Sequence, residues 1–429
     1  MKKRYAVVGM SHRAIAVFIH PILTTYNDVA ELCAFMDIST ERMAGMNEQQ
    51  KSSVPCYTPD QFDRMIAETR PDVVIVASMD ATHDQYIIAA LRHDLDVYCE
   101  KPLTTDAAKA RAILAAERVS KGRVTVTFNY RYAAVPTQVR EMIQDGAIGR
   151  VVSVDMNYYL DTYHGSSYFM RWNRRRECSG GLNVHKSTHH FDLVQWWIGQ
   201  QPVEVFSYGA RNFFGPDGPR NPSRRDGRTC PTCAERQKCA YFMRWHRDEW
   251  RGAPTGKPLD EHVDGVQFSH YKSASARRCI YDSEIDIEDT YTALVKYDGG
   301  AMMSYSLIGS APFEGYRCAI NGIDGRIEFE AIHGREGQPV PEPPRAAIQH
   351  FGLFGARNVI TPISLPGGHG GADPLLQDDL FRGRDESEKA VRMAPLMDGI
   401  LSVLTGVAAR TSMVERRPVT MQELLEDPA

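Results

Sequence analysis

The chain of 429 residues lacks several features that would place it in a specialised class. It has no run of about 18 apolar residues, so no membrane span is expected. Neither sign of charge predominates, because 50 Lys and Arg residues face 54 Asp and Glu residues, and the net charge of −4 argues against nucleic acid or an acidic membrane as a partner. Nine cysteines, an odd number scattered along the chain, argue against a disulfide scaffold.

The first ten residues, MKKRYAVVGM, also lack the apolar run of a signal peptide and predict a first β-strand instead. With the scattered thiols, this start predicts a cytoplasmic protein whose cysteines are reduced. A hydrophobic content of 43% and a charged content of 24% are typical of a globular chain. The length exceeds what one ordinary core holds and predicts two domains.

Apolar strand patterns alternate with helical patterns in the first part of the chain. The strand patterns lie at residues 4–9, 29–37, 71–78, 96–102 and 123–130. This alternation predicts a parallel, doubly wound α/β sheet. From about residue 151 the strand patterns lengthen, and the Asp298-Gly299-Gly300 turn is typical of a hairpin. We therefore expect a first domain over 1–128 and an α+β domain with an open, mostly antiparallel sheet over 129–429, with a cysteine-containing insertion around 211–280.

The segment VVGMSHRA follows the first strand and opens a helix, where backbone N–H groups hold the pyrophosphate of a dinucleotide. The fingerprint is incomplete: Gly9 is present, but Ser11 and Ala14 stand at the second and third glycine positions. Asp37, at the end of the second strand, predicts hydrogen bonds to the adenosine ribose and a preference for NAD over NADP, although Arg42 is close by. The alternative is a Rossmann-like scaffold without a nucleotide.

The segment CEKPLTTD carries a second signal. It places Glu100, Lys101 and Pro102 at the carboxyl end of a strand, where open α/β sheets bind ligands. A lysine there is suited to holding a substrate hydroxyl or the alkoxide that develops from it. The alternative is a loop lysine in a surface ion pair.

With these motifs, the chain resembles the Gfo/Idh/MocA family of oxidoreductases nearly from end to end. The resemblance rests on VVGMSHRA, Asp37, ASMDATH, EKP, FNYRY, GG…H…HHFDLVQWWIG, EIDIEDT, EGYRCAINGIDGRIE and GGHGGADP. It implies a cofactor domain for NAD(P), a substrate pocket between the two domains, and a sugar, a polyol or a derivative as substrate. The predicted cofactor-binding residues are Gly9, Ser11, His12, Arg13, Asp37, Ser78, His83, Glu100, Lys101, Asn129 and Trp172.

The stretch GGLNVHKSTHHFDLVQWWIG predicts the proton-transfer site. In one helix, His185, His189, Asp192 and Trp196 would share a face. Zinc is disfavoured because Lys186 stands where the His-Glu-x-x-His motif of zinc proteases has its glutamate. Histidine is suited to receive the hydroxyl proton that departs as hydride leaves carbon.

The resemblance implies a catalytic group that contains Lys101 and His189. The family often has an aspartate where this chain has His185, which leaves open which histidine is the base. The predicted catalytic set is Lys101, His185, Lys186 and His189, and we expect His189 to transfer the proton while His185 tunes it. His190 points away from His189 and is predicted to lie in the core or to support the site from behind.

Upstream, the segment DTYHGSSYFMRWNRRREC supplies aromatic and arginine side chains that suit a sugar ring or an anionic group. A solvated basic loop is the alternative for Arg175 and Arg176. The resemblance also places the late GGHGGADP loop near the pocket. The predicted substrate-binding residues are Tyr132, Tyr163, His164, Arg171, Arg174 and His369.

The segment CPTCAERQKC gathers three thiols. Cys230, Cys233 and Cys239, with Cys279 as a fourth ligand, fit a structural zinc ion, and His246 or His270 could replace Cys279. The alternative is a set of reduced thiols packed in a loop.

These features predict an NAD-dependent oxidoreductase that acts on a sugar or glycoside. The rival is a redox-neutral glycosidase or lyase, which oxidises its sugar transiently, as NAD-dependent sulfoquinovosidases do. A non-catalytic sensor is disfavoured because the EKP segment and His189 are both present. The predicted partners are a small carbohydrate substrate and further copies of the chain in a dimer or tetramer.

Overall fold

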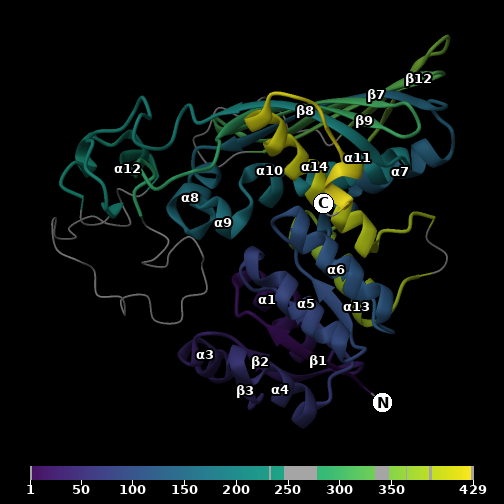
Figure 1. The fold of residues 1–429 in the computed structure, drawn as a ribbon. Coiled ribbons are helices and arrows are strands. Elements are labelled where there is room, and N and C mark those ends of the chain that lie inside the picture. Colours follow the sequence, from purple (N-terminus) through teal and green to yellow (C-terminus); the bar gives the residue numbers. More distant parts are fainter. Residues whose placement is uncertain are drawn as a thin grey trace.

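The computed structural model describes residues 2–230, 233–245, 278–333, 347–363, 365–385 and 389–426. It contains two sheets, one in the N-terminal body and one across the top of the C-terminal body (Figure 1). Part of the predicted insertion around 211–280 lies outside the described residues, as do His246 and His270. No helix within the described ranges is both long and apolar enough to cross a membrane.

The first sheet has seven strands in the order β15-β6-β5-β4-β1-β2-β3. Its first six strands along the chain are parallel, as the alternation of strand and helix predicted. The order reverses between β1 and β4, and a ligand crevice forms at such a switch point. The strands are β1 (Lys3–Val8), β2 (Ala30–Met36), β3 (Cys56–Tyr57), β4 (Val73–Val76), β5 (Asp96–Cys99), β6 (Val124–Val126) and β15 (Ala394–Pro395).

Helices flank this sheet, and some of them begin at a polar side chain that accepts a hydrogen bond from one of the first N–H groups of the helix. Ser39 caps α3, and Asp106 caps α6. The sheet strands between them are almost fully buried on both faces, as a parallel sheet requires. The helices are α1 (His12–Ala14) with η1 (Ile15–Ile19) and α2 (His20–Leu23), α3 (Thr40–Gln50), α4 (Phe62–Thr69), α5 (His83–Arg92) and α6 (Ala107–Val119).

The second sheet has nine strands in the order β14-β13-β12-β11-β7-β10-β9-β8-β16. All neighbours are antiparallel except β7 and β10, which confirms the predicted mostly antiparallel sheet. The strands are β7 (Val151–Asp161), β8 (Pro202–Ala210), β9 (Thr290–Tyr297), β10 (Met302–Ala311), β11 (Glu314–Gly322), β12 (Gly325–His333), β13 (Ile348–Gly352), β14 (Arg357–Ile360) and β16 (Val419–Thr420).

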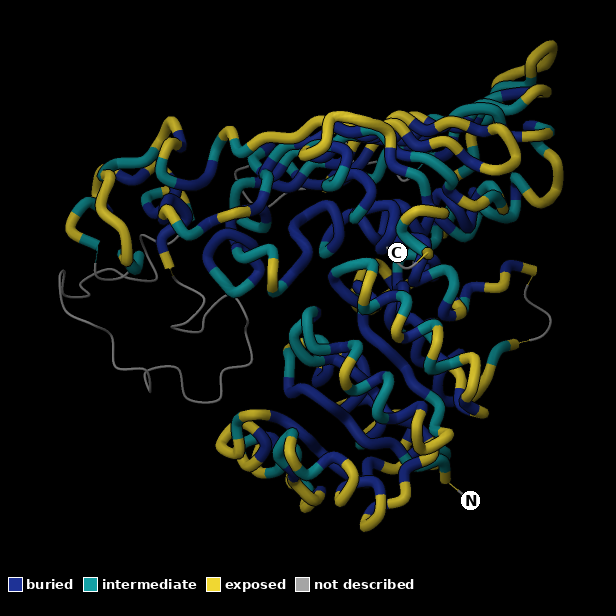
Figure 2. The backbone as a smooth tube through the Cα atoms, in the orientation of Figure 1, coloured by how far each residue is buried: buried dark blue, intermediate teal, exposed yellow. Residues whose placement is uncertain are grey.

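In the described part of the chain, helices cover the face of this sheet that looks toward the first domain (Figure 1). The helices on that side are buried, whereas the tube along the top of the sheet is largely exposed (Figure 2). Along β9, buried and exposed residues alternate, as in a sheet with one solvated face. The helices include α7 (Ala134–Gln144), α8 (His164–Met170), α9 (Arg176–Ser179), α10 (Leu182–His185), α11 (Thr188–Ile198) and α14 (Leu396–Glu415).

A late segment returns to the first sheet. Helix α13 (Ala372–Phe381) packs on it, with the Phe381 ring edge-on to Tyr5 at 5.4 Å, and β15 pairs antiparallel with β6. The division predicted at residue 128 places this segment with the second domain. Its return brings Asp373 next to the loop that follows β1, so the chain contributes to the first domain twice.

Candidate active site

Gly9 follows β1 at the point where two main chains approach each other. Its φ is +91°, and a Cβ there would lie 2.6 Å from the Cα of Ser78, which follows β4. The helical segment 12–23 begins next, with the Ser11 hydroxyl accepting a hydrogen bond from the N–H of Ala14 at 3.1 Å. A tight glycine turn at a helix N-terminus suits a pyrophosphate. Gly9, Ser11 and His12 therefore fit a dinucleotide.

Asp37 lies beside this loop, at the end of β2. Its carboxylate accepts hydrogen bonds from the N–H of Met10 at 2.6 Å and from the N–H of Ser39 at 2.9 Å. The half-exposed Arg42 guanidinium lies 3.7 Å from the same carboxylate. Because each carboxylate oxygen has two lone pairs, Asp37 keeps acceptor capacity for ribose hydroxyls.

Arg13, which was predicted to bind the cofactor, forms two ion pairs. Its guanidinium lies 3.1 Å from Glu100 and 3.1 Å from Asp373. Asp373 also accepts hydrogen bonds from Asn129 at 3.0 Å and faces His369 Nδ1 at 2.8 Å. Burial would raise the pKa of Asp373, but His369 and Arg13 hold it well below its ordinary value. Asp373 thus contacts three predicted site residues, Arg13, Asn129 and His369.

His83 holds two site loops together. Its Nδ1 lies 2.9 Å from the carbonyl oxygen of Pro102, and its Nε2 lies 3.1 Å from that of Ser78. The imidazole is almost fully buried. His83 therefore positions the loop that carries Lys101 rather than facing a ligand itself.

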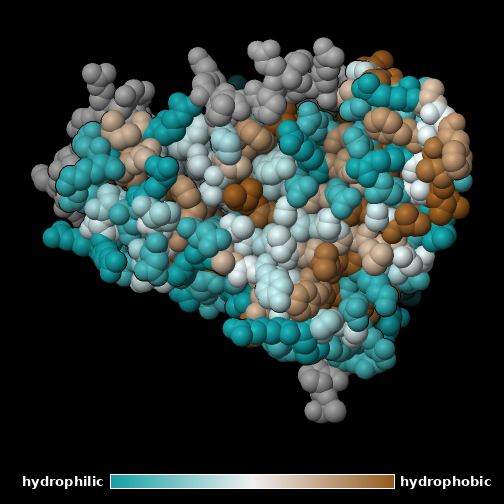
Figure 3. All heavy atoms as spheres, turned by 90° about the horizontal axis from the view of Figure 1, so that it is seen from above, coloured by the Kyte–Doolittle hydropathy of each residue, from teal (hydrophilic) through white to brown (hydrophobic). Residues whose placement is uncertain are grey.

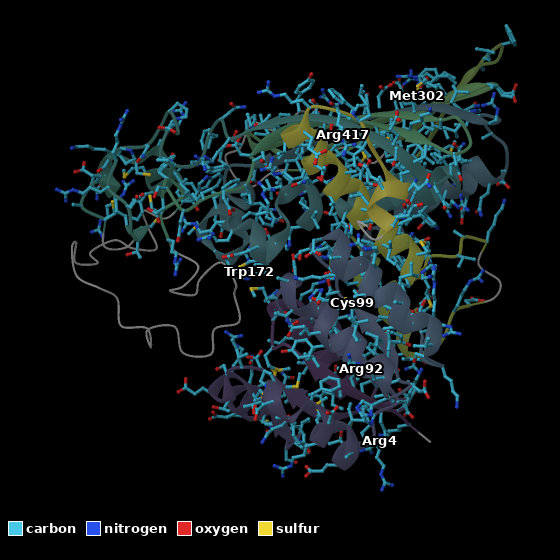
Figure 4. The ribbon with its side chains drawn as sticks, in the orientation of Figure 1. Arg4, Arg92, Cys99, Trp172, Met302 and Arg417 are labelled. Atoms are coloured by element: carbon cyan, nitrogen blue, oxygen red, sulfur yellow. The ribbon has the colours of Figure 1, made fainter. Side chains whose placement is uncertain are left out.

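Lys101 follows β5 and crosses to the second domain. Its ammonium donates a hydrogen bond to the backbone carbonyl of His185 at 3.3 Å. Burial lowers the pKa of Lys101, and Lys186 lowers it further, whereas Asp80 and Glu100 oppose the change. Figure 4 labels Trp172 of the second domain and Cys99 of the first, and Cys99 lies two residues before Lys101. The two domains meet at the level of these two labels.

His185 forms a buried pair with Asp80. Its Nδ1 is hydrogen-bonded to the carboxylate of Asp80, which begins the 3₁₀ helix η3 (Asp80–Thr82) in the first domain. Burial lowers the pKa of His185 well below its ordinary value, as do Lys101 and Arg171. Burial raises the pKa of Asp80, although His83 and Lys101 oppose that shift. Asp80 lies inside the ASMDATH motif, but a lone loop aspartate carried no signal that it meets a histidine of the other domain.

His189 lies against an aromatic ring, whereas His185 lies against a carboxylate. Its ring stacks on Tyr130 at 4.2 Å with an interplanar angle of 13°, and only 5% of the residue is exposed. Its buried Nδ1 has no hydrogen-bond partner among the described residues. Burial, followed by Lys101 and Lys186, lowers the pKa of His189 well below its ordinary value. A buried neutral imidazole with an unsatisfied nitrogen is suited to bind a ligand hydroxyl.

The single helix predicted through His185 and His189 is wrong. Helix α10 ends at His185, and α11 begins at Thr188. The hydroxyl of Ser187 lies 2.9 Å from that of Tyr305 and also accepts a hydrogen bond from Tyr291, so the connecting turn is held against β10 and β9. The two imidazoles therefore approach the site from separate helices.

His190 and Asp192, which follow His189 on α11, are buried in the core. His190 Nδ1 lies 2.7 Å from the Tyr305 hydroxyl, and Asp192 forms a buried ion pair with Arg131. Lys186 is buried as well, with its ammonium 5.0 Å from the centre of the Tyr158 ring. Its charge lowers the pKa of His189 and His190.

Two aromatic rings and one predicted substrate residue, Arg171, lie around His185. The Tyr168 and Trp172 rings lie edge-on to His185 at 5.3 Å and 5.8 Å. The guanidinium of Arg171 lies 5.8 Å from the centre of the Tyr168 ring. Tyr163, at the start of α8, has its ring 5.4 Å from Trp245 of α12 (Ala240–Trp245).

His164 forms a second imidazole–carboxylate pair. Its Nδ1 lies 2.7 Å from Glu314, and its Nε2 lies 2.9 Å from the hydroxyl of Tyr168. Burial opposes ionisation of Glu314, but His164 and Lys186 lower its pKa to about 2. Burial lowers the pKa of His164 despite the carboxylate. Glu314 and Tyr168 were missed because nothing in the sequence relates β11 to α8.

Two predicted substrate residues lie away from this group. Arg174 is 1% exposed and donates to the carbonyl of Cys279, with Asp282 at 3.3 Å, so it supports the end of the insertion. Tyr132 is buried in the first domain's core, with the guanidinium of Arg392 4.8 Å from its ring centre. Arg174 and Tyr132 are therefore packed among other side chains and do not join the group around His185.

The four cysteines of the predicted zinc site are free thiols. The charges of Cys279, Cys239 and Cys233 add to burial in raising the pKa of Cys230, so the four lie in one neighbourhood. Across the described ranges, however, no three His, Cys, Asp or Glu side chains are arranged to hold a metal ion. The residues present do not fit the predicted zinc ion in this structure.

Two family models match the chain. The model for the NAD-binding Rossmann fold of the oxidoreductase family covers residues 3–128, and that for its C-terminal α/β domain covers residues 140–421. YteT of Bacillus subtilis (strain 168), named only as an oxidoreductase, is 46% identical over 428 residues, or 99% of each chain. Inositol 2-dehydrogenase of Rubrobacter xylanophilus is 30% identical over 187 residues, 42% of this chain and 48% of that one. The chain belongs to the Gfo/Idh/MocA oxidoreductase family.

Solved structures share the fold at low identity. A levoglucosan dehydrogenase in complex with NADH and levoglucosan has a TM-score of 0.64 and 16% identity, over 98% of this chain and 99% of that chain. An aldose-aldose oxidoreductase from Caulobacter crescentus in complex with glycerol has a TM-score of 0.64 and 18% identity, over 98% of this chain and all of that chain. At these identities the likeness concerns the fold alone.

Proposed function

We propose that the protein is an NAD-dependent oxidoreductase that interconverts a hydroxyl and a carbonyl group on a sugar, a glycoside or a sugar derivative. The observation that carries this proposal is the meeting of Lys101, from the cofactor domain, with His185 and His189, from the second domain, in one buried group. The names of the inositol, levoglucosan and aldose enzymes among its relatives support a polyhydroxylated substrate.

The Gly9 loop and Asp37 would hold the cofactor, with Ser78, Glu100 and Trp172 at the edge of its site. When bound, NAD supplies the hydride acceptor. Lys101 holds the substrate hydroxyl and stabilises the oxygen as its negative charge develops. His189 accepts the hydroxyl proton, since its imidazole is neutral and its buried nitrogen is unsatisfied.

The buried ammonium of Lys186 contributes positive charge to the proposed site. Its charge disfavours imidazolium at His185 and His189, so the two rings stay available as proton acceptors. Arg171 adds a second cation beside His185. This charge favours a substrate that carries a carboxylate, a sulfonate or a similar anionic group.

A redox-neutral glycosidase or lyase is the second candidate. Plain hydride transfer needs one base, whereas this site holds the His185–Asp80 and His164–Glu314 pairs as well as His189. In the redox-neutral course, transient oxidation acidifies the neighbouring C–H, the anomeric group leaves, water adds, and the hydride returns to carbon. Those proton transfers occur at several atoms, and several imidazoles would serve them.

One screen separates the two functions. Purified protein with NAD is offered free sugars, inositols, uronic acids and aryl glycosides, while NADH absorbance and aglycone release are both followed. Accumulating NADH supports net oxidation, and aglycone release without net NADH supports the glycosidase. The Lys101→Ala variant serves as the blank. A panel in which neither signal exceeds this blank contradicts the proposal.

We further propose that the protein forms a homo-oligomer through the outer face of the second sheet. Figure 3 views the molecule from the side of this face, where hydrophobic surface is interspersed with hydrophilic surface. Tyr208, Leu294 and Met302 on β8, β9 and β10 are 60–64% exposed. Light scattering of the protein and of the Leu294→Glu variant tests this assembly. We also propose a cytoplasmic location, because the nine cysteines are free thiols.

A further inference from the structure

The Asp80–His185 contact joins the two domains inside the proposed site. Asp80 comes two residues after Ser78 at the end of the β4 segment, and His185 is the last residue of α10. The Asp80 and His185 side chains are 5% and 12% exposed. The contact therefore brings a carboxylate of the first domain against an imidazole of the second.

The hydrogen bonds around His185 define which of its nitrogens accepts a proton. Nδ1 faces Asp80, and Nε2 lies 3.4 Å from the side-chain amide nitrogen of Asn173, which can only donate. Nδ1 therefore carries the proton that bonds to Asp80, and Nε2 is an acceptor. Asn173 is itself buried, and its Oδ1 has no partner among the described residues.

The charges around the Asp80–His185 pair disfavour the imidazolium form of His185. Burial, Lys101, Arg171, Lys186 and His164 all lower the pKa of His185. Around Asp80, His83, Lys101 and Arg171 favour the ionised form, and burial opposes it strongly enough to raise the pKa of this carboxyl. The thiols of Cys99 and Cys178 also lie within electrostatic reach of Asp80. One proton is thus shared between Asp80 and Nδ1, and the next proton that the pair takes up goes to Nε2.

We infer that Asp80 is a positioning residue which holds His185 with Nε2 as the acceptor, so that the pair forms a second proton-accepting group beside His189. The inference rests on the proposed function. As a carbinol is oxidised, the C–H bond breaks with hydride leaving to the cofactor, and the O–H bond breaks with its proton forming a new N–H bond. Asp80 balances the charge that this proton adds when the acceptor is His185.

The first test needs no substrate. Protein labelled with ¹⁵N in its 14 histidines is examined by NMR without cofactor, and the His185→Gln variant identifies the His185 signals. We expect a protonated Nδ1 and an unprotonated Nε2 in the unmodified protein. In Asp80→Asn the charge that favours the Nδ1–H form is lost and the amide N–H can donate to Nδ1, so the Nε2–H form should gain population in competition with the Asn173 amide that donates to Nε2. An Nε2–H form in the unmodified protein, or an unchanged tautomer in Asp80→Asn, would overturn the inference.

The second test uses the compound found in the screen. Asp80→Asn should lower kcat by about 10²–10⁴-fold. The acid limb of its pH profile should shift to lower pH by about 1–3 units, because the carboxylate no longer favours protonation of the pair. Asp80→Glu, which keeps the charge, should restore part of the rate and the original limb.

The matched control is Asp398→Asn, which removes a partly exposed carboxylate from the buried Arg131 and lies outside the proposed site. It should leave the pH profile in place. If Asp80→Asn keeps the kcat and the pH profile of the unmodified protein, as Asp398→Asn should, the inference is wrong and Asp80 has only a structural role. If Asp80→Asn does not fold, the tautomer of the unmodified protein and the Asp80→Glu profile decide the matter. Failure of the screen would leave the NMR result unaffected, so the two proposals fail separately.

Discussion

Arg13 and Asp373 are 360 residues apart in the chain, and their side chains form an ion pair at 3.1 Å. Arg13 belongs to α1, directly after the loop that follows β1, and Asp373 belongs to the first turn of α13. Through this pair the last part of the chain holds the proposed cofactor loop in place.

Replacing Asp373 with Asn should destabilise the protein by about 1–3 kcal/mol, because Arg13 and Asn129 lose a charged acceptor in a largely buried setting. NAD should also bind more weakly, since the loop after β1 is no longer fixed. Urea unfolding and calorimetric titration measure the two effects. Asp378→Asn on the same helix, which removes only the acceptor of the Tyr26 hydroxyl, is the control. Equal losses in both variants would contradict the role of Asp373.

His190 should make stability depend on pH. Burial, followed by Lys186 and Lys101, lowers the pKa of this imidazole well below its ordinary value, so the folded state keeps it neutral. Below about pH 6.5 the unfolded chain binds a proton that the folded chain does not, and folding loses up to about 1.4 kcal/mol per pH unit from this group. His190→Gln should therefore be less destabilised relative to the unmodified protein at pH 5 than at pH 7. Urea unfolding at both values, with the exposed His20→Gln as control, checks this; an unchanged difference would count against it.

Asp37 should select NAD over NADP. A carboxylate at the end of β2 repels a 2′-phosphate, and Asp37→Ser should narrow the difference between the two affinities. The gain for NADP should depend on the neighbouring Arg42, which lies 3.7 Å from Asp37, so Asp37→Ser combined with Arg42→Ala should lose it. Calorimetry of the three proteins with NAD and with NADP gives all six affinities. Tighter NADP binding by the unmodified protein would sink the assignment.

His189 should govern turnover and leave cofactor affinity nearly unchanged. Removing a positioned general base lowers kcat by about 10²–10⁴-fold, so His189→Ala should fall in that range, and Lys101→Ala should be at least as impaired. Steady-state rates on the compound from the screen, with NAD affinity measured separately, provide the comparison. If His189→Ala keeps near-normal turnover while His185→Ala loses it, His185 and Asp80 are the principal base and its partner.

The cofactor half was predictable because its signals are local. Alternating strand and helix periods determine a parallel sheet, and Gly9, Asp37 and Lys101 each lie where a strand of that sheet ends. The carboxyl ends of parallel strands meet at one edge, so residues in this position come together whatever the rest of the chain does. The contact of Asp80 could not be predicted in this way, since its partner His185 is in the other domain.

Periodicity misled at the histidine cluster. The spacing of His185 and His189 is helical, but Ser187 bonds to Tyr305 and Tyr291 of the second sheet, and the helix is interrupted there. A few tertiary hydrogen bonds outweighed the local preference. The cysteine spacing likewise predicted zinc, whereas the side chains across the described ranges are not arranged to bind one.

The sequence by itself determined the α/β fold class and the family, and it predicted the lysine and histidines of the proposed site, because periodicity and strand-end motifs act over short distances. Only the tertiary structure decided which carboxylates accompany them. Asp80 meets His185, Glu314 meets His164 and Asp373 meets Arg13 across 105, 150 and 360 residues of chain. A carboxylate in a loop looks the same in sequence whether it faces water or a buried cation. What distinguishes the two is the loss of solvent on folding, which makes a distant partner necessary.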